Sequence, residues 1–187
     1  MHTNQLLSRI SRADMTYTTE SASTTFSNRF DSSTQFADAV PATVALFKRL
    51  SVDDQLALLW YAYTEMGSSI TPAAPGAARL QLAEGLLSQI KKMSHAEQLQ
   101  VMRDLAANRN TAISRGYGVL STNTKLAFWY ELSVLMEQGI VAPMPRGYQP
   151  SSDVTEVLQA IKSLDFGQQI TVLRNTVVDM GVDPLAD

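Results

Sequence analysis

Apolar and aromatic residues recur at helical spacing in two stretches of the chain, residues 55–66 and 125–136. Positions i, i+3, i+4 and i+7 share one face of an α-helix. That face carries Leu56, Leu59, Trp60, Tyr63 and Met66 in the first stretch, and Leu126, Trp129, Tyr130, Ser133 and Met136 in the second. Each stretch contains one of the 2 Trp residues of the chain. The pattern fits either two core helices or the two walls of an apolar slot, and periodicity does not separate these interpretations.

The same spacing predicts helices along nearly all of the chain after Gln35. We expect them at residues 41–50, 51–66, 77–93, 94–108, 111–119, 121–138, 152–163 and 165–180. Proline-rich segments at 70–76 and 141–150 predict loops. No segment alternates apolar and polar residues with the two-residue period of a half-buried strand. The predicted fold class is therefore all-α.

Four of the predicted helices begin with a related motif. An apolar residue precedes a Ser or Asp cap, and a second apolar residue follows the cap. The four caps are Ser51, Ser94, Ser121 and Asp165. In three copies the third residue after the cap is Asp54, Glu97 or Gln168, which predicts a capping box. Four similarly started helices indicate two related helical halves packed together.

Composition and charge exclude several classes of function. With 187 residues, 45% of them hydrophobic, the chain is expected to form one globular domain with a tail. The net charge of -3 gives no basis for a nucleic-acid or anionic-membrane partner. The absence of Cys excludes disulfides and thiol catalysis, and 2 His argue against a multi-His metal site. Because no apolar run approaches membrane-spanning length, we expect a soluble, cytoplasmic protein.

The first part of the chain differs from the rest in composition. Residues 1–35 are a Ser/Thr-rich N-terminal arm, and residues 36–187 are the helical domain. Hydroxyl side chains compete for backbone hydrogen bonds and lower helix propensity. We therefore expect the arm to be mobile or laid on the surface.

The sequence offers no recognisable active site. It lacks the G-x-S-x-G, P-loop, G-x-G-x-x-G and H-E-x-x-H motifs. Glu65 and Glu131 lie close to the aromatic faces, where burial would perturb them, but no nucleophile, base or oxyanion donor accompanies them. We therefore expect no enzymatic activity.

Arg174 is a charged residue among apolar helical neighbours. In the fourth copy of the motif it takes the place that Trp60 has in the first, near Ile170 and Val178. A charge in such a position must reach water, find a partner or serve a binding surface. The pattern leaves an arginine extended to water and a binding residue equally open.

Several long motifs resemble the N-terminal domain of the cyanobacterial orange carotenoid proteins. They lie at residues 40–67, 73–78, 128–131, 139–145, 168–175 and 178–181. The resemblance covers roughly residues 38–183. The light-switching members of the family carry a second, mixed α/β domain, and no counterpart follows here. The chain is therefore most similar to the stand-alone helical carotenoid proteins, and we expect no light-driven switch.

The resemblance implies two interleaved four-helix bundles with a ketocarotenoid, of canthaxanthin or echinenone type, held non-covalently between them. Ser133 stands where the family has a glycine facing the pigment. A polyene is a long apolar rod, which needs aromatic and aliphatic walls, with Met filling irregular gaps. With Ser133 included, the pocket positions fall on Leu56, Leu59, Trp60, Tyr63, Met102, Leu126, Trp129, Tyr130, Ser133, Met136, Met144, Pro145, Ile170, Thr171 and Arg174.

The function that the resemblance implies is photoprotection by a water-soluble pigment protein. It would act as a singlet-oxygen quencher, a carotenoid carrier or a quencher of phycobilisome excitation. Arg174 matches the residue that, in the two-domain protein, meets the partner domain when dark and the phycobilisome when active. Besides the carotenoid, the implied partners are the thylakoid-associated phycobilisome, through the surface around Arg174, and a stand-alone homologue of the missing C-terminal domain. We expect a monomer or a weak dimer.

An alternative function is that of a helical adaptor without pigment. In that case the aromatic faces are plain core, and the protein binds a protein partner. An enzyme acting on an apolar substrate in the same slot would need a catalytic group that the sequence does not provide.

Overall fold

The computed structural model describes residues 39–67 and 80–185, which lie within one compact unit of the chain, Ala37–Asp187. The predicted arm at 1–35 and the predicted loop at 70–76 fall outside the described residues. Every regular element in the described part of the chain is helical. The all-α prediction is therefore confirmed.

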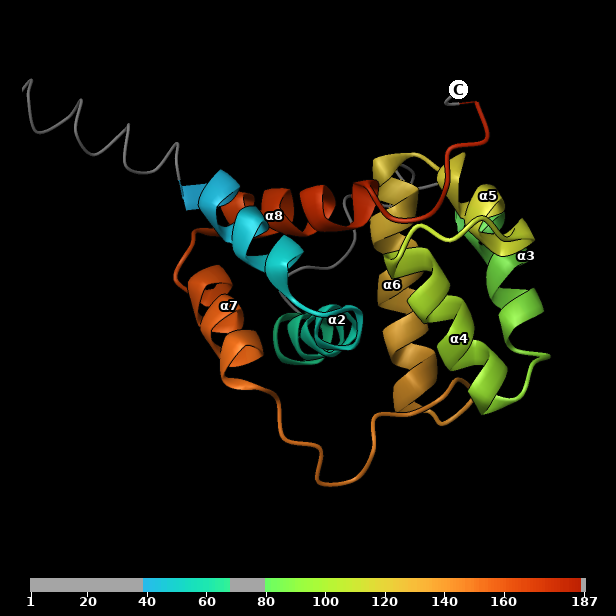
Figure 1. The fold of residues 1–187 in the computed structure, drawn as a ribbon, viewed down its shortest axis with the longest axis horizontal. Coiled ribbons are helices and arrows are strands. Elements are labelled where there is room, and N and C mark those ends of the chain that lie inside the picture. The colour runs from blue at the N-terminus through green and yellow to red at the C-terminus, as the bar shows by residue number, and fades with distance from the viewer. Residues whose placement is uncertain (1–38, 68–79, 186–187) are drawn as a thin grey trace, which may run out of the picture. The chain divides into compact units, whose positions relative to one another are not determined.

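A helical segment over residues 39–49 precedes the labelled helices of Figure 1. These helices are α2 (Val52–Met66), α3 (Leu80–Ile90), α4 (His95–Ala106), α5 (Ala112–Gly118), α6 (Thr122–Glu137), α7 (Ser152–Lys162) and α8 (Phe166–Val178). Each predicted helix has its counterpart, and the described ends agree to within about three residues, little more than the usual uncertainty of helix boundaries.

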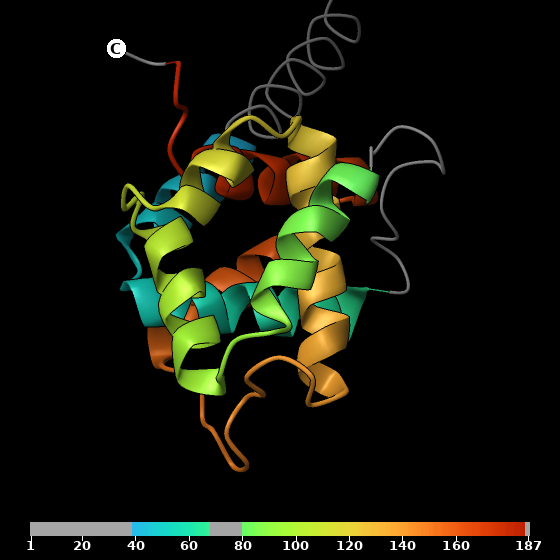
Figure 2. The ribbon, with the colours of Figure 1, turned by 90° about the vertical axis from the view of Figure 1, so that its right-hand side faces the viewer.

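The helices form two interleaved four-helix bundles (Figure 1). One bundle contains residues 39–49, α2, α7 and α8, and the other contains α3 to α6, which the chain inserts between α2 and α7. Within the bundles, α2 packs on α7, and α3 packs on α5 and α6. Contacts of α2 with α4 and α6, and of α6 with α8, join the two bundles. Figure 2 shows α2 passing behind the frame of α3 to α6.

Two of the three predicted capping boxes are confirmed. At α4, the Ser94 N–H donates to Glu97 Oε2 at 2.8 Å, and at α8 the Asp165 N–H donates to Gln168 Oε1 at 3.2 Å. The box at Ser51 is wrong. The Asp54 N–H donates to Ser51 Oγ at 3.2 Å, but the Asp54 carboxylate accepts the hydroxyls of Ser51 and Ser151 at 2.9 and 3.2 Å. Aspartate is one methylene shorter than glutamate, and these hydroxyls satisfy it.

Burial distinguishes the central helix from the peripheral ones. Residues 124–129 of α6 are buried without interruption, and Leu132 and Ser133 are also buried. In α7 only one stripe is buried, made of Val154, Val157, Leu158 and Ile161. A helix that is buried around its circumference lies inside the core, whereas a single stripe marks a covering helix. α6 is therefore the element that both bundles share as a wall.

Candidate functional site

An apolar cavity of about 220 Å³ lies where α2 faces α4 and α6, at the boundary between the two bundles. The segment after α6, residues 142–148, closes another side. The lining residues are Asp53, Leu56, Ala57, Leu59, Trp60, Tyr63, Leu99, Met102, Arg103, Trp129, Leu132, Ser133, Met136, Ala142, Pro143, Met144, Pro145 and Tyr148. The cavity brings the two aromatic stretches of the sequence together.

Most of the sequence-predicted site residues line this cavity. They are Leu56, Leu59, Trp60, Tyr63, Met102, Trp129, Ser133, Met136, Met144 and Pro145. The other predicted residues do not line it: Leu126, Tyr130, Ile170, Thr171 and Arg174.

Two of the residues away from the cavity support its wall from behind. Leu126 is buried, and its carbonyl accepts a hydrogen bond from the Tyr63 hydroxyl at 3.3 Å. The ring of Tyr130 packs edge-on against Tyr63, with 6.2 Å between the ring centroids. On α8, Thr171 is exposed and Arg174 is half-buried. The structure thus places Leu126 and Tyr130 beside a cavity residue and leaves the three α8 residues outside the lining.

A hydrogen-bond chain fixes the α6 wall. The Trp129 indole donates from Nε1 to the Tyr117 hydroxyl at 2.9 Å, and Tyr117 donates to the carbonyl of Val177 at 2.9 Å. Phe128 packs edge-on against both rings, with centroid distances of 5.2 and 5.7 Å. Burial raises the pKa of Tyr117 well above its ordinary value, although the hydrogen bond with Trp129 acts in the opposite direction. These contacts join α5, α6 and α8 around one orientation of Trp129.

Close backbone packing holds Tyr117 itself. Gly181 has a φ of +77°, and a Cβ built there would lie 2.6 Å from Cδ1 of Tyr117. The Gly181 N–H donates to the carbonyl of Leu105 at 2.9 Å. Only glycine combines this backbone conformation with such a close approach.

The α2 wall is less restrained. Trp60 is half-buried, and its Nε1 is buried without a hydrogen-bond partner in the part of the chain that the structure describes. Its ring packs edge-on against Tyr61 at a centroid distance of 4.9 Å. A second hollow, of about 510 Å³, shares Trp60, Met136 and Tyr148 with the cavity. Trp60 therefore contributes to the walls of both hollows, and a change of its rotamer would alter both.

The segment after α6 is anchored at its start. Gln98 is buried, and its Nε2 donates to the carbonyls of Ile90 and Ile140 at 3.1 and 3.2 Å. Its Oε1 accepts the Ala142 N–H at 2.8 Å. A buried amide with its donors and acceptor paired is a strong restraint. Farther along, the Tyr148 N–H donates to the Pro145 carbonyl at 3.1 Å, and the Tyr61 hydroxyl donates to the Tyr148 carbonyl at 3.4 Å.

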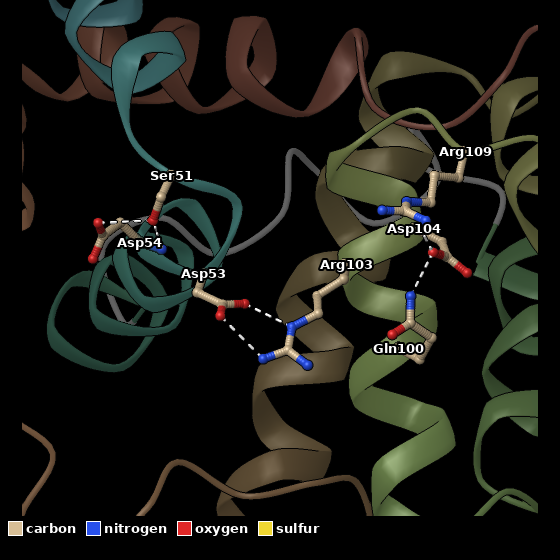
Figure 3. Close-up of polar contacts among 7 residues, drawn as sticks. All are labelled: Ser51, Asp53, Asp54, Gln100, Arg103, Asp104 and Arg109. Atoms are coloured by element: carbon tan, nitrogen blue, oxygen red, sulfur yellow. Dashed lines mark hydrogen bonds and ion pairs between the residues drawn. The ribbon is translucent and has the colours of Figure 1, made fainter.

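An ion pair lies at the rim of the cavity. Arg103 on α4 donates from Nε and Nη2 to the two carboxylate oxygens of Asp53 on α2, at 2.7 and 3.0 Å (Figure 3). Both residues were missed by the sequence analysis. The signal was present, because Asp53 is three, four and seven positions before Leu56, Ala57 and Trp60 and shares their helical face.

Glu65, one of the two carboxylates singled out in the sequence, does not line the cavity. Glu65, which we expected near the aromatic face and open to burial, is exposed and pairs with Lys162. Within 39–67 and 80–185, no group of three His, Cys, Asp or Glu residues could hold a metal ion. No helix in that part of the chain is long and apolar enough to cross a membrane.

Comparisons with known proteins agree with this geometry. Residues 33–183 match the family model "Orange carotenoid protein, N-terminal". The chain belongs to this family. A relative from Nostoc sp. (strain PCC 7120), named "Orange carotenoid-binding domain-containing protein", is 70% identical over 173 residues, which are 92% of this chain and 100% of the relative.

Solved structures of the family share the fold. The Orange Carotenoid Protein of Anabaena (Nostoc) sp. PCC 7120, which binds canthaxanthin, matches with a TM-score of 0.72 and 59% identity over 79% of this chain and 48% of its own. The Red Carotenoid Protein of the same organism, also with canthaxanthin, matches with a TM-score of 0.69 and 42% identity over 76% of this chain and 97% of its own. This chain therefore corresponds to about half of the Orange Carotenoid Protein and to nearly all of the Red Carotenoid Protein. The matched names describe pigment proteins and no enzymatic activity.

Proposed function

We propose that the protein binds a ketocarotenoid, of canthaxanthin or echinenone type, in the cavity between α2, α4 and α6. The observation that carries this proposal is the apolar cavity between the two bundles, with both Trp residues of the chain in its walls. The two solved relatives described above bind canthaxanthin, which supports the same ligand class here.

The lining suits a polyene. Leu and Met side chains supply an adaptable apolar surface, and the rings of Trp60, Tyr63 and Trp129 supply flat faces for a conjugated chain. The cavity is smaller than the ~300–1,000 Å³ typical of small-molecule sites. We infer that a long pigment also occupies the neighbouring hollow, which shares Trp60 with the cavity. Binding then includes a movement of the α2 wall.

The role we propose is photoprotection. A bound carotenoid takes up excitation energy or quenches singlet oxygen and releases heat, so the cofactor supplies the photochemistry and the protein holds and orients it. The protein then acts as a singlet-oxygen quencher or carotenoid carrier in the cytoplasm. No step of this role needs a catalytic side chain.

A second role, quenching of phycobilisome excitation at the thylakoid, has one supporting observation. Arg174 on α8 is half-buried, and its Nε is buried without a hydrogen-bond partner among the described residues. A guanidinium N–H that lacks an acceptor among the described residues is suited to donate to an acceptor on a partner. The same residue suits a stand-alone homologue of the family's C-terminal domain.

The test of the main proposal is the visible absorption spectrum of protein purified from cells that make canthaxanthin. We expect a bound band that is red-shifted from the free pigment and unchanged by illumination. A double variant, Trp60→Leu with Trp129→Leu, should lose or shift the band while circular dichroism stays helical. A folded but colourless wild-type protein would overturn the proposal and favour a helical adaptor.

A further inference from the structure

Most polar groups in the inner part of the cavity are paired within the protein, and the indole N–H of Trp60 is the exception among the described residues. The Tyr63 hydroxyl donates to the Leu126 carbonyl at 3.3 Å, and the Ser133 hydroxyl donates to the Tyr130 carbonyl at 2.7 Å. The indole N–H of Trp129 donates a hydrogen bond to the Tyr117 hydroxyl. Polar groups that are paired within the protein make poor ligand contacts, because a ligand would have to replace an existing hydrogen bond. The deep walls therefore recognise the apolar part of a ligand.

The rim differs, because it carries a charged hydrogen-bond donor, one of whose nitrogens is unpaired among the described residues. Two of the three guanidinium nitrogens of Arg103 bind Asp53, and the third, Nη1, has no hydrogen-bond partner among the described residues. Figure 3 shows this nitrogen without a dashed line. The Arg103 side chain is 40% exposed, so the rim is accessible. Arginine carries donors only and keeps its charge at all ordinary pH values.

Asp53 fixes the orientation of that donor. Two parallel hydrogen bonds hold the plane of the guanidinium, which a single contact would leave free to rotate. The hydrogen bond from Arg103 lowers the pKa of Asp53, so the carboxylate stays charged at neutral pH. The pair also joins α2 to α4 at the cavity rim, and both of its residues line the cavity.

We propose that Arg103 is a specificity-determining residue, whose free N–H donates a hydrogen bond to the terminal carbonyl oxygen of the pigment. Asp53 is its positioning residue. This inference rests on the proposed function, and it adds a reason within this chain for choosing carbonyl-ended carotenoids over hydrocarbon ones. A hydrocarbon end group offers no acceptor to this donor.

A competition between two pigments tests the proposal. Canthaxanthin and β-carotene share one skeleton and differ by the ring carbonyls. Apoprotein is offered both in equal amounts, and the bound pigments are extracted and quantified by chromatography. Wild type should favour canthaxanthin about ten-fold, the effect of one hydrogen bond to a charged donor at a partly exposed site. Arg103→Met should abolish the preference, and Asp53→Asn should reduce it.

The matched control is Arg109→Met. Arg109 lies in the same region of the chain and pairs with Asp104, but it does not line the cavity. This variant removes the same charge and should keep the wild-type preference. A preference lost equally in both variants would show a general charge effect and overturn the assignment to Arg103.

The carbonyl stretching band of bound canthaxanthin gives a second measurement, and its wild-type result does not depend on the folding of any variant. In wild type, one of the two carbonyls should absorb at the lower wavenumber of a hydrogen-bonded group, and Arg103→Met should return it to the free position. Two free carbonyls in wild type, or equal uptake of both pigments, would overturn the inference and leave carotenoid binding standing. Uptake of neither pigment would instead overturn the proposed function.

Discussion

Trp60 on α2 and Trp129 on α6 occupy similar places in similar sequences, yet their surroundings differ. Trp129 is 3% exposed, and its indole N–H enters a hydrogen-bond chain that ends on α8. Trp60 is half-buried, its N–H has no partner within residues 39–67 and 80–185, and it lines two hollows. The cavity therefore has one fixed wall and one adjustable wall. A protein that must admit a long rigid ligand needs both, because the fixed wall keeps the site in register while the other yields.

The comparison predicts its largest effect for the two Trp→Leu variants measured separately. Trp129→Leu should lower the free energy of unfolding by about 3 kcal/mol, because it empties a closed part of the core and removes a buried hydrogen bond. Trp60→Leu should cost about 1 kcal/mol, because its surroundings are already open. Urea unfolding of both variants without pigment measures the difference. Equal losses would contradict the distinction between the walls.

A smaller effect is expected from removing the hydroxyl that holds the fixed wall. Tyr117→Phe leaves the buried N–H of Trp129 without its acceptor, which should cost about 2 kcal/mol of unfolding free energy. Tyr61→Phe is the control, since its hydroxyl makes only a 3.4 Å contact with the Tyr148 carbonyl and should cost less than about 0.5 kcal/mol. The same urea titrations apply. If Tyr117→Phe is as stable as the control, the hydrogen-bond chain does not fix Trp129.

Alkaline pH should reveal the burial of Tyr117 through a smaller change in the free energy of unfolding. Burial raises the pKa of Tyr117, so the folded protein keeps a proton that the unfolded chain releases near pH 10. The contribution of Tyr117 to stability is therefore fully present below about pH 10 and declines above it, by about 1.4 kcal/mol per pH unit. Between about pH 10 and 11, the free energy of unfolding should therefore fall by about 1.4 kcal/mol less in Tyr117→Phe than in wild type. Parallel pH profiles would show that Tyr117 titrates in the folded state as it does in the unfolded chain.

The sequence allowed the helices to be predicted well, because their starts are encoded locally. Ser94 with Glu97, and Asp165 with Gln168, satisfy one another's backbone donors within a single turn. The Ser51 box failed because aspartate is shorter than glutamate and because the Asp54 carboxylate accepts the hydroxyls of Ser51 and of Ser151, which lies far along the chain. Local rules do not include partners that only the tertiary fold supplies.

The cavity lining was predicted less completely, for three physical reasons. α6 is buried around its circumference, so apolar periodicity does not tell which face meets a cavity, and Leu126 and Tyr130 lie off the lining. Tyr148 lines the cavity beside α2 residues that lie far from it in the sequence, and no local pattern encodes that contact. Arg103 was missed for another reason: a charged residue one position after Met102 is ordinarily assigned to a solvated face.

The most direct test of the two-wall account is amide hydrogen exchange of the protein with and without bound canthaxanthin. The account predicts that pigment strongly slows exchange in α2 around Trp60 and in residues 143–148, whereas α6 around Trp129 is protected in both states and changes little. Equal gains of protection on α2 and α6 would contradict it, and so would a gain confined to α6. Either result would mean that the pigment orders the wall that we describe as fixed.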